Sequence, residues 1–172
     1  MKKSVLVSVF VVLFAFGAKS RNRNQASFQF SYNQIELGYQ YKFIHQKIWG
    51  EAFAGLGNQD INSSFDDFLT GIRIGGAVFS NDKNTIDLTA GFGVYFPNNN
   101  YYSAATSVLG GGLRYSRFIG KTKKHSLFLN AGYQYGKRDY KQEYLNDEIY
   151  VATISKFKIS PMYFSIGYGF NF

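Results

Sequence analysis

The sequence predicts an all-β fold, an eight-stranded antiparallel up-and-down barrel that crosses a membrane, and three observations support this prediction. Apolar and polar side chains alternate over most of the chain, short clusters of turn residues separate the alternating segments, and the last segment, 162–172, is apolar or aromatic at every even position. In water such an aromatic strand face promotes aggregation. In a closed barrel through a bilayer, the same alternation places one face against lipid and the other in a filled polar lumen.

The start of the chain is typical of a secretory signal peptide. A lysine pair precedes an apolar run at 5–18, and the small residues Ala18 and Ser20 occupy the positions that a signal peptidase reads. The run is shorter than the roughly 20 residues that a membrane-spanning helix needs, which disfavours a permanent anchor. We therefore expect a cleaved signal peptide at 1–20 and an outer-membrane β-barrel at 21–172.

Composition excludes several classes of protein. The chain has no Cys, which excludes disulfides and thiolate metal sites. Its mean hydropathy of -0.20 agrees with a membrane barrel, because alternating strands average to a nearly neutral value. No second apolar stretch is long enough for a membrane helix, so a barrel is the remaining way to span a bilayer. In this setting the net charge of +8 does not indicate nucleic-acid binding.

Eight segments of period two define the expected strands. They lie at 26–32, 35–43, 48–56, 68–79, 86–96, 109–116, 127–135 and in a final strand that ends at Phe172. Residues 150–159 would make a ninth strand, but single-chain bacterial barrels have even strand numbers. We therefore assign 150–159 to an extension of the eighth strand, after a hairpin tip at 136–148.

Charge placement sets the register of these strands. Within the eight segments the outward phase contains no charged residue, Asn or Gln. All mid-strand charges occupy the other phase: Glu36, Lys42, Glu51, Arg73, Asp87 and Arg114. A slip of one residue would put them into lipid, at a cost of roughly 2 to 4 kcal/mol for each basic residue near the midplane.

This pattern resembles the small outer-membrane barrels of the OmpA and OmpX type, especially the "outer membrane protein beta-barrel" sequences of Bacteroidetes. The most specific element is the terminal ladder of Phe164, Ile166, Tyr168, Phe170 and Phe172. It is similar to the signal that the barrel-assembly machinery recognises in that family. The resemblance implies localisation in the bacterial outer membrane and contact with its lipid, and it leaves activity open.

The inward charges allow two interpretations. Glu51, Arg73, Asp87 and Arg114 alternate in sign on neighbouring strands, and the interior of an eight-stranded barrel is just wide enough for side chains to fill. Because buried charges need partners, a structural plug is the first interpretation, and a gated ion path or proton relay is the second. Five inward aromatic residues would narrow the lumen further: Trp49, Phe53, Phe79, Tyr95 and Phe128.

An enzymatic role finds little support. Some barrels that this chain resembles modify lipid A with a His near the outer rim, but His45 and His125 fall in expected periplasmic turns. The pattern shows no nucleophile arrangement or metal-ligand cluster, so we expect no catalytic residue, metal or cofactor.

Basic and aromatic residues of the expected outer hairpins are candidates for binding. Lys137, Lys156 and Lys158 keep the outward phase beyond the apolar band, where they would meet lipopolysaccharide phosphates or be ordinary solvated charges. Loop tyrosines suit either recognition of a protein or glycan, or a membrane-interface belt: Tyr101, Tyr102, Tyr140, Tyr144 and Tyr150.

The expected function is therefore that of an envelope component with a plugged lumen. It would act through its outer hairpins or its lipid-facing wall, alone or as an accessory subunit of a larger outer-membrane complex. The alternative is a small pore for solutes, and a lipid A-modifying enzyme is a distant third.

Overall fold

The computed structural model describes residues 23–43, 47–57, 67–98, 105–146, 149–158 and 162–172, and for 138–158 it describes the backbone alone. The predicted signal peptide, His45, Tyr101 and Tyr102 lie outside the described residues. Within the described part of the chain, no helix is long and apolar enough to span a membrane.

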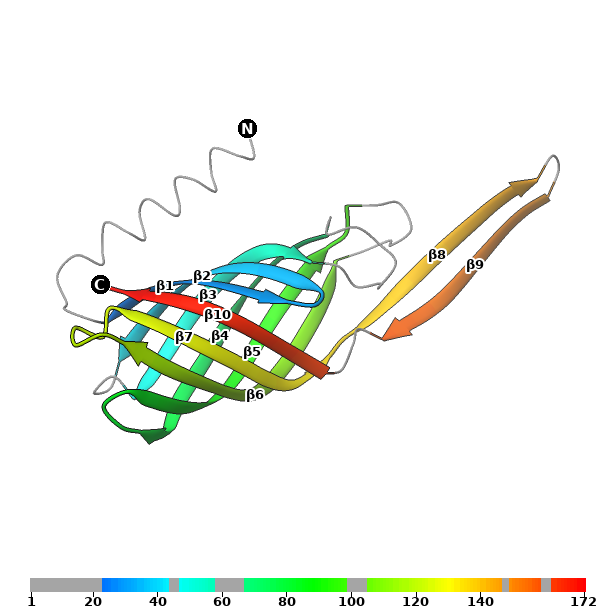
Figure 1. The fold of residues 1–172 in the computed structure, drawn as a ribbon. Coiled ribbons are helices and arrows are strands. Elements are labelled where there is room, and N and C mark those ends of the chain that lie inside the picture. The colour runs from blue at the N-terminus through cyan, green and yellow to red at the C-terminus, as the bar shows by residue number, and fades with distance from the viewer. Residues whose placement is uncertain (1–22, 44–46, 58–66, 99–104, 147–148, 159–161) are drawn as a thin grey trace.

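The described residues form ten strands, and eight of these close into one barrel (Figure 1). They are β1 (Asn24–Ser31), β2 (Gln34–Phe43), β3 (Ile48–Gly57), β4 (Asp67–Ser80), β5 (Asn84–Phe96), β6 (Thr106–Ile119), β7 (His125–Tyr135), β8 (Lys137–Asn146), β9 (Ile149–Lys158) and β10 (Met162–Asn171). The barrel order is β1-β10-β7-β6-β5-β4-β3-β2, and every neighbouring pair is antiparallel. The predicted all-β, eight-stranded antiparallel barrel is confirmed.

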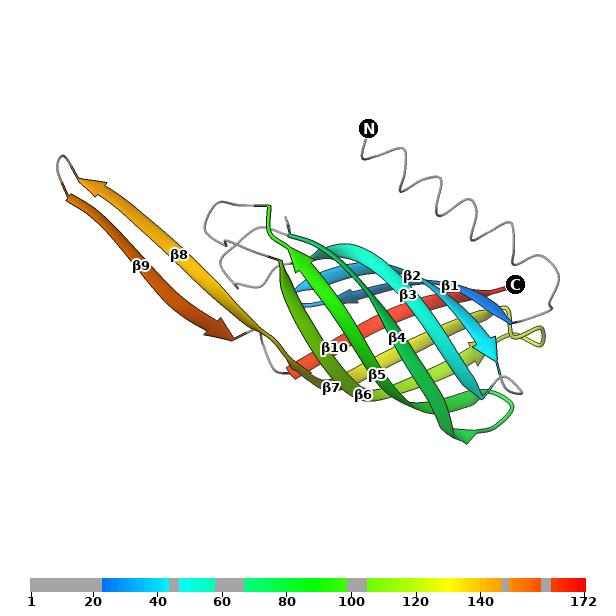
Figure 2. The ribbon, with the colours of Figure 1, turned by 180° about the vertical axis from the view of Figure 1, so that it is seen from behind.

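The barrel has two different ends. The start of β1 and the end of β10 share one end with the β2–β3, β4–β5 and β6–β7 connections, and we call this the turn end (Figure 2). The opposite end, here the loop end, carries the remaining connections. There β8 and β9 form a separate two-stranded sheet that projects away from the barrel as a ribbon (Figure 1).

The polarity of the barrel is inverted relative to a water-soluble core. Outward side chains are apolar and exposed, as shown by Ile72 at 64% and Leu109 at 62%, whereas the inward side chains of Gln29 and Glu51 are each 3% exposed. Within the described residues, the buried hydrophobic side chains are few: Trp49, Leu69, Tyr95, Val108 and Phe128. The strands therefore close around polar groups and present their apolar face to the surroundings.

Two inward glycines make room for the largest rings in the lumen. A Cβ at Gly75 would lie 2.2 Å from the Trp49 ring, and a Cβ at Gly167 would lie 2.2 Å from the Phe128 ring. Both distances are far below a van der Waals contact, so any side chain at these positions would displace the rings.

Three sequence expectations are corrected by the structure. A bulge between Ala77 and Phe79 shifts the register of β4, so that Phe79 pairs with the outward Ile86 and is 51% exposed instead of facing the lumen. The sixth strand does not stop at 116 but continues to Ile119, which places exposed Arg117 in the outward phase.

The third correction concerns the connection to the last barrel strand. The segment expected as a hairpin tip, 136–148, contains β8, and the 150–159 extension is largely β9. These two strands pair with each other rather than continuing the barrel. The expected even count of barrel strands is unaffected, because β10 alone is the eighth.

Candidate functional site

Glu51 lies at the centre of an ionic layer that crosses the lumen. Its Oε2 atom accepts from Arg73 Nη1 at 3.0 Å and from Arg114 Nη2 at 2.8 Å, while Oε1 accepts from the Ser27 hydroxyl at 2.8 Å. Arg73 is the register partner of Glu51 on β4, but Arg114 reaches it from β6, across the lumen. The carboxylate is therefore bound from three strands.

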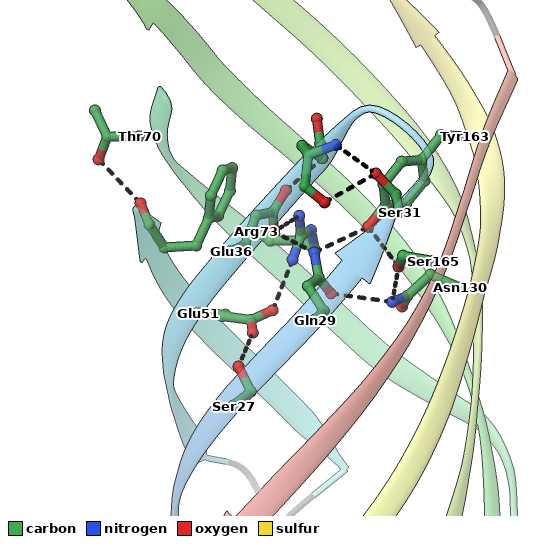
Figure 3. Close-up of polar contacts among 12 residues, drawn as sticks. Ser27, Gln29, Ser31, Glu36, Glu51, Thr70, Arg73, Asn130, Tyr163 and Ser165 are labelled. Carbon is green, nitrogen blue, oxygen red and sulfur yellow. Dashed lines mark hydrogen bonds and ion pairs between the residues drawn. The ribbon is translucent and has the colours of Figure 1, made fainter. Parts of the chain in front are cut away.

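Glu36 provides the second carboxylate of this layer. Arg73 Nη2 donates to Glu36 Oε2 at 3.0 Å, so one guanidinium joins both acidic residues. The side-chain amides of Gln29 and Gln34 also donate to Glu36. Figure 3 shows Glu36, Glu51 and Arg73 converging, with Asn130 extending the network from Gln29 at 3.1 Å.

Arg114 is fully enclosed by the lumen. Beyond its bond to Glu51, it donates to Asn130 Oδ1 at 2.7 Å and to Gln40 Oε1 at 3.0 Å. Its guanidinium carbon lies 4.5 Å from the Trp49 ring and 4.6 Å from the Phe128 ring. The cation thus contacts two aromatic rings while its N–H groups donate to acceptors, which is the environment that a planar guanidinium tolerates best when buried.

The ionic layer is neutral, since two carboxylates face two guanidiniums. A buried charge is costly unless paired and hydrogen-bonded, and here each charge meets both conditions. Because the contributing side chains come from β1, β2, β3, β4, β6 and β7, the layer links most of the barrel wall across its interior.

The layer separates two cavities. The loop-end cavity has a volume of about 70 Å³ and is bordered by Arg73, Glu36 and Tyr163. Toward the loops it meets an apolar cluster of Leu69, Tyr95 and Val108, and the Tyr95 hydroxyl donates to Gln34 Oε1 at 2.6 Å. This end of the lumen is therefore occupied by a packed cluster.

The turn-end cavity is larger, about 240 Å³, and polar. Lys42 and Asp87 face it, together with Gln25, Ser116 and Ser126. The Lys42 Nζ atom donates to Asn171 Oδ1 at 2.9 Å and lies 5.4 Å from the Phe118 ring centroid.

The six predicted lumen charges therefore divide into two groups. Glu36, Glu51, Arg73 and Arg114 form the ionic layer, whereas Lys42 and Asp87 line the turn-end cavity. Arg114 is the register partner of Asp87, but its side chain contacts the Trp49 and Phe128 rings and pairs with Glu51 instead. Asp87 consequently forms no ion pair within the described residues.

Sequence reasoning missed the neutral partners that complete the layer. Ser27, Gln29, Gln34, Gln40, Asn130 and Ser165 all hydrogen-bond within it or beside it. Their signal was present, because each occupies the inward phase of its strand. No group of three potential metal ligands occurs among the described residues, and His125 lies exposed at the start of β7, with Nδ1 2.5 Å from the Tyr168 hydroxyl.

The remaining predicted residues lie at the two ends of the barrel. Exposed Lys137 starts the ribbon, with Nζ 5.7 Å from the Tyr135 ring centroid, and it is the register partner of Lys158, while Lys156 is opposite Asp139. The terminal ladder lies along β10, whose outward residues are exposed by 58%, 55%, 41% and 38% at Phe164, Ile166, Tyr168 and Phe170. Phe172 follows directly and stacks on Phe170 at 6.1 Å.

Comparisons with family models, with curated proteins and with solved structures find no match to this chain. The class that fold and lumen define is a closed antiparallel β-barrel with a charge-paired interior.

Proposed function

We propose that this chain is a bacterial outer-membrane barrel with a plugged lumen, exported by its signal peptide and acting as a structural or binding component of the envelope. The observation that carries the proposal is the inverted polarity of the barrel: the outward side chains of its strands are apolar and exposed, and the charges in the middle of the strands are inside. An exposed apolar surface of this extent is unfavourable in water, whereas lipid solvates it without cost to the paired interior.

The projecting ribbon supports a binding role. A two-stranded sheet is marginally stable in water on its own, and β8–β9 is paired to no other strand among the described residues. The outer edges of a hairpin can accept a further strand from a partner. The partner we propose at the loop end is a protein or a glycan, met by the ribbon and the neighbouring loops.

Lipopolysaccharide is the lipid partner that we propose at the loop end, level with the base of the ribbon. Lys137 and Lys158 are directly opposite each other at the base of the ribbon, and like charges at opposed positions are unfavourable without a counterion. A lipid A phosphate would supply that counterion, and Lys156 would add to the positive potential that attracts it. Each cation near an anionic surface contributes about 1 kcal/mol.

Replacing Lys137, Lys156 and Lys158 with Ser tests this contact. The triple variant is expected to fold normally in neutral detergent, to bind lipopolysaccharide bilayers more weakly, and to bind them with a smaller dependence on salt. Lys141→Ser, farther along the ribbon, is the matched control. Equal amounts of co-purified lipopolysaccharide for the wild type and the triple variant across a salt series would show that these lysines are solvated charges.

A pore is the alternative function, and the turn-end cavity is the observation in its favour. Against it, the ionic layer and the apolar cluster of Leu69, Tyr95 and Val108 occupy the lumen above that cavity. We therefore propose that the resting barrel does not conduct. Large, steady single-channel currents from the purified protein would favour the pore. For a catalytic role, the described residues offer no comparable support.

Fractionation and electrophoresis test the proposal as a whole. We expect the protein in the outer-membrane fraction and expect its band to shift between unboiled and boiled samples, as folded barrels do. The terminal ladder is proposed to engage the barrel-assembly machinery during this insertion. Release of the protein in soluble form without detergent would contradict the proposal.

A further inference from the structure

We infer that the turn end of the barrel carries a ring of cations that binds the anionic phospholipid headgroups of the adjacent leaflet. The inference rests on the proposed membrane location, and it concerns the end opposite to the lipopolysaccharide contact. The ring consists of seven exposed residues: Arg23, Lys47, Lys83, Arg117, Lys121, Lys123 and Lys124.

The charge at this end is strongly unbalanced. Asp82 is the one exposed acidic residue among the described parts of the turn end, and Lys123 Nζ lies 3.6 Å from its carboxylate. The loop end differs, because its connections at 32–33, 58–66 and 97–105 contain no Lys or Arg at all, and its cations are confined to the ribbon. Solubility alone would not require the cations to be concentrated in the connections of one end and absent from those of the other.

The positions of the cations fit a flat surface. One precedes β1, one lies in the β2–β3 connection, one in the β4–β5 connection, and the rest in or beside the β6–β7 connection. Every connection at this end therefore contributes, and the barrel order distributes the charges around the rim. A plane of headgroups contacts a whole rim at once, whereas a globular partner would contact one sector of it.

Arg117 fixes the depth of the ring. It lies in the outward phase of β6, two residues beyond Tyr115, and is exposed on the wall that faces lipid. Within the described residues, Arg117 forms no ion pair. A charge in this phase is unfavourable among acyl chains but favourable at the interface, where a guanidinium binds phosphate through two hydrogen bonds.

Aromatic residues mark the same level of the wall. In register, Arg117 is opposite Leu127 on β7, and Leu127 is opposite Tyr168 on β10. The centroid of the His125 ring lies 6.0 Å from that of Tyr168 and 5.5 Å from that of Phe170. Three aromatic side chains therefore lie together at the turn end of β7 and β10. Aromatic girdles lie at the membrane interface, so Arg117, level with this group, and the turn cations beyond it are at headgroup height.

The experiment uses the full mature barrel, refolded in neutral detergent and reconstituted into vesicles of phosphatidylcholine with and without phosphatidylglycerol. The readout is the amount of each lipid that remains bound after detergent extraction. The test variant combines Arg117→Ser, Lys121→Ser and Lys124→Ser, and the matched control is Lys141→Ser in the ribbon. Arg117→Lys tests separately whether the guanidinium is preferred to a point charge.

We expect the wild type and Lys141→Ser to retain phosphatidylglycerol in preference to phosphatidylcholine. The triple variant should retain at least fivefold less phosphatidylglycerol, since each cation near an anionic surface contributes about fivefold. Arg117→Lys should fall between the two. The folded fraction in neutral detergent should be equal for all four proteins.

Equal retention of phosphatidylglycerol by the wild type and the triple variant would overturn the inference. The inference would also be overturned if the triple variant kept its bound lipid but, unlike the wild type, no longer bound soluble fragments of the cell wall. Either result leaves the proposed membrane location intact, because the barrels would still be inserted and would still shift on gels. Failure of the wild type to insert into any vesicle would overturn both proposals.

Discussion

Arg114 shows how a single residue can be charged and buried in this lumen. Only 2% of it is exposed, yet its guanidinium edge meets Glu51, Gln40 and Asn130. A Lys at this position would carry the charge but could not bridge these acceptors or stack between rings. The plug therefore depends on the shape of the side chain as well as on its charge.

Arg73→Ala is expected to destabilise the barrel by about 3 to 5 kcal/mol, the cost of breaking a buried ion pair from one side. Among the described residues, Arg73 is the one cation paired with Glu36, and it also pairs with Glu51. The measurement is the free energy of unfolding in neutral detergent. Adding Glu36→Gln should recover part of the loss because it removes the stranded carboxylate. Arg117→Ala, which removes an exposed arginine, is the control. If Arg73→Ala and Arg117→Ala lowered the free energy of unfolding equally, the proposed role of the ionic layer would be contradicted.

Neighbouring glycines on β4 provide a matched pair. Gly75→Ala should lower the free energy of unfolding by about 1 to 3 kcal/mol, as overpacking does, because its Cβ would lie 2.2 Å from the Trp49 ring. Gly76→Ala should change stability little, since no atom lies within 4 Å of the Cβ position. Equal effects of the two substitutions would show that Trp49 is not held as described.

At the scale of elements, β10 closes the barrel against β1. The Phe172 N–H donates to the Asn24 carbonyl at 2.9 Å, just beyond the paired strands. That bond uses the backbone, so it survives a change of side chain. The outward ring of Phe172 is therefore available for recognition during assembly without being required for the closed structure.

Phe172→Asp should consequently lower the amount of folded barrel in cells more than it lowers refolding in vitro. The measurement compares folded and unfolded bands from membranes with those from the refolded protein, and Phe172→Tyr is the conservative control. Unchanged folded levels in cells would count against the proposed assembly signal.

The elements that could be predicted from sequence are the barrel strands whose apolar and polar residues alternate, and from β2 to β6 an inward charge also fixes the phase. Glu51 and Arg73 are direct register partners, so their pairing follows from the strand pattern alone. The contact of Arg114 with Glu51 could not be predicted, because it joins β6 to β3 across the lumen and depends on how the barrel closes.

Other elements left weaker signals in the sequence. Lys137–Asn146 is largely polar without alternation, and it is a strand because β9 pairs with it. The bulge at Ala77/Phe79 has no residue signature that distinguishes it from regular alternation, so the sequence pattern predicts the wrong face for Phe79. Arg117 lies just beyond 109–116, the range predicted for the sixth strand, and the strand continues past it to Ile119.

At the scale of the whole molecule, the account assigns three separate roles to three regions. We propose that the wall contacts lipid, that the ionic layer holds the wall together from inside, and that the two ends meet different anionic surfaces. These roles are separable by mutation, because the residues that carry them occupy different phases or different ends of the same strands.

The most direct test of the central claim measures what surrounds the wall. The chain has no Cys, so single nitroxide labels can be attached at Ile72→Cys, Leu109→Cys and Leu129→Cys, where the native side chains are 64%, 62% and 53% exposed. Lys121→Cys, in a turn, is the control. In lipid vesicles, we predict that the three wall labels collide more often with oxygen, which concentrates in lipid, than with a water-soluble nickel complex, and that the control shows the reverse. Wall labels that collide mainly with the nickel complex would contradict the claim that this barrel spans a membrane.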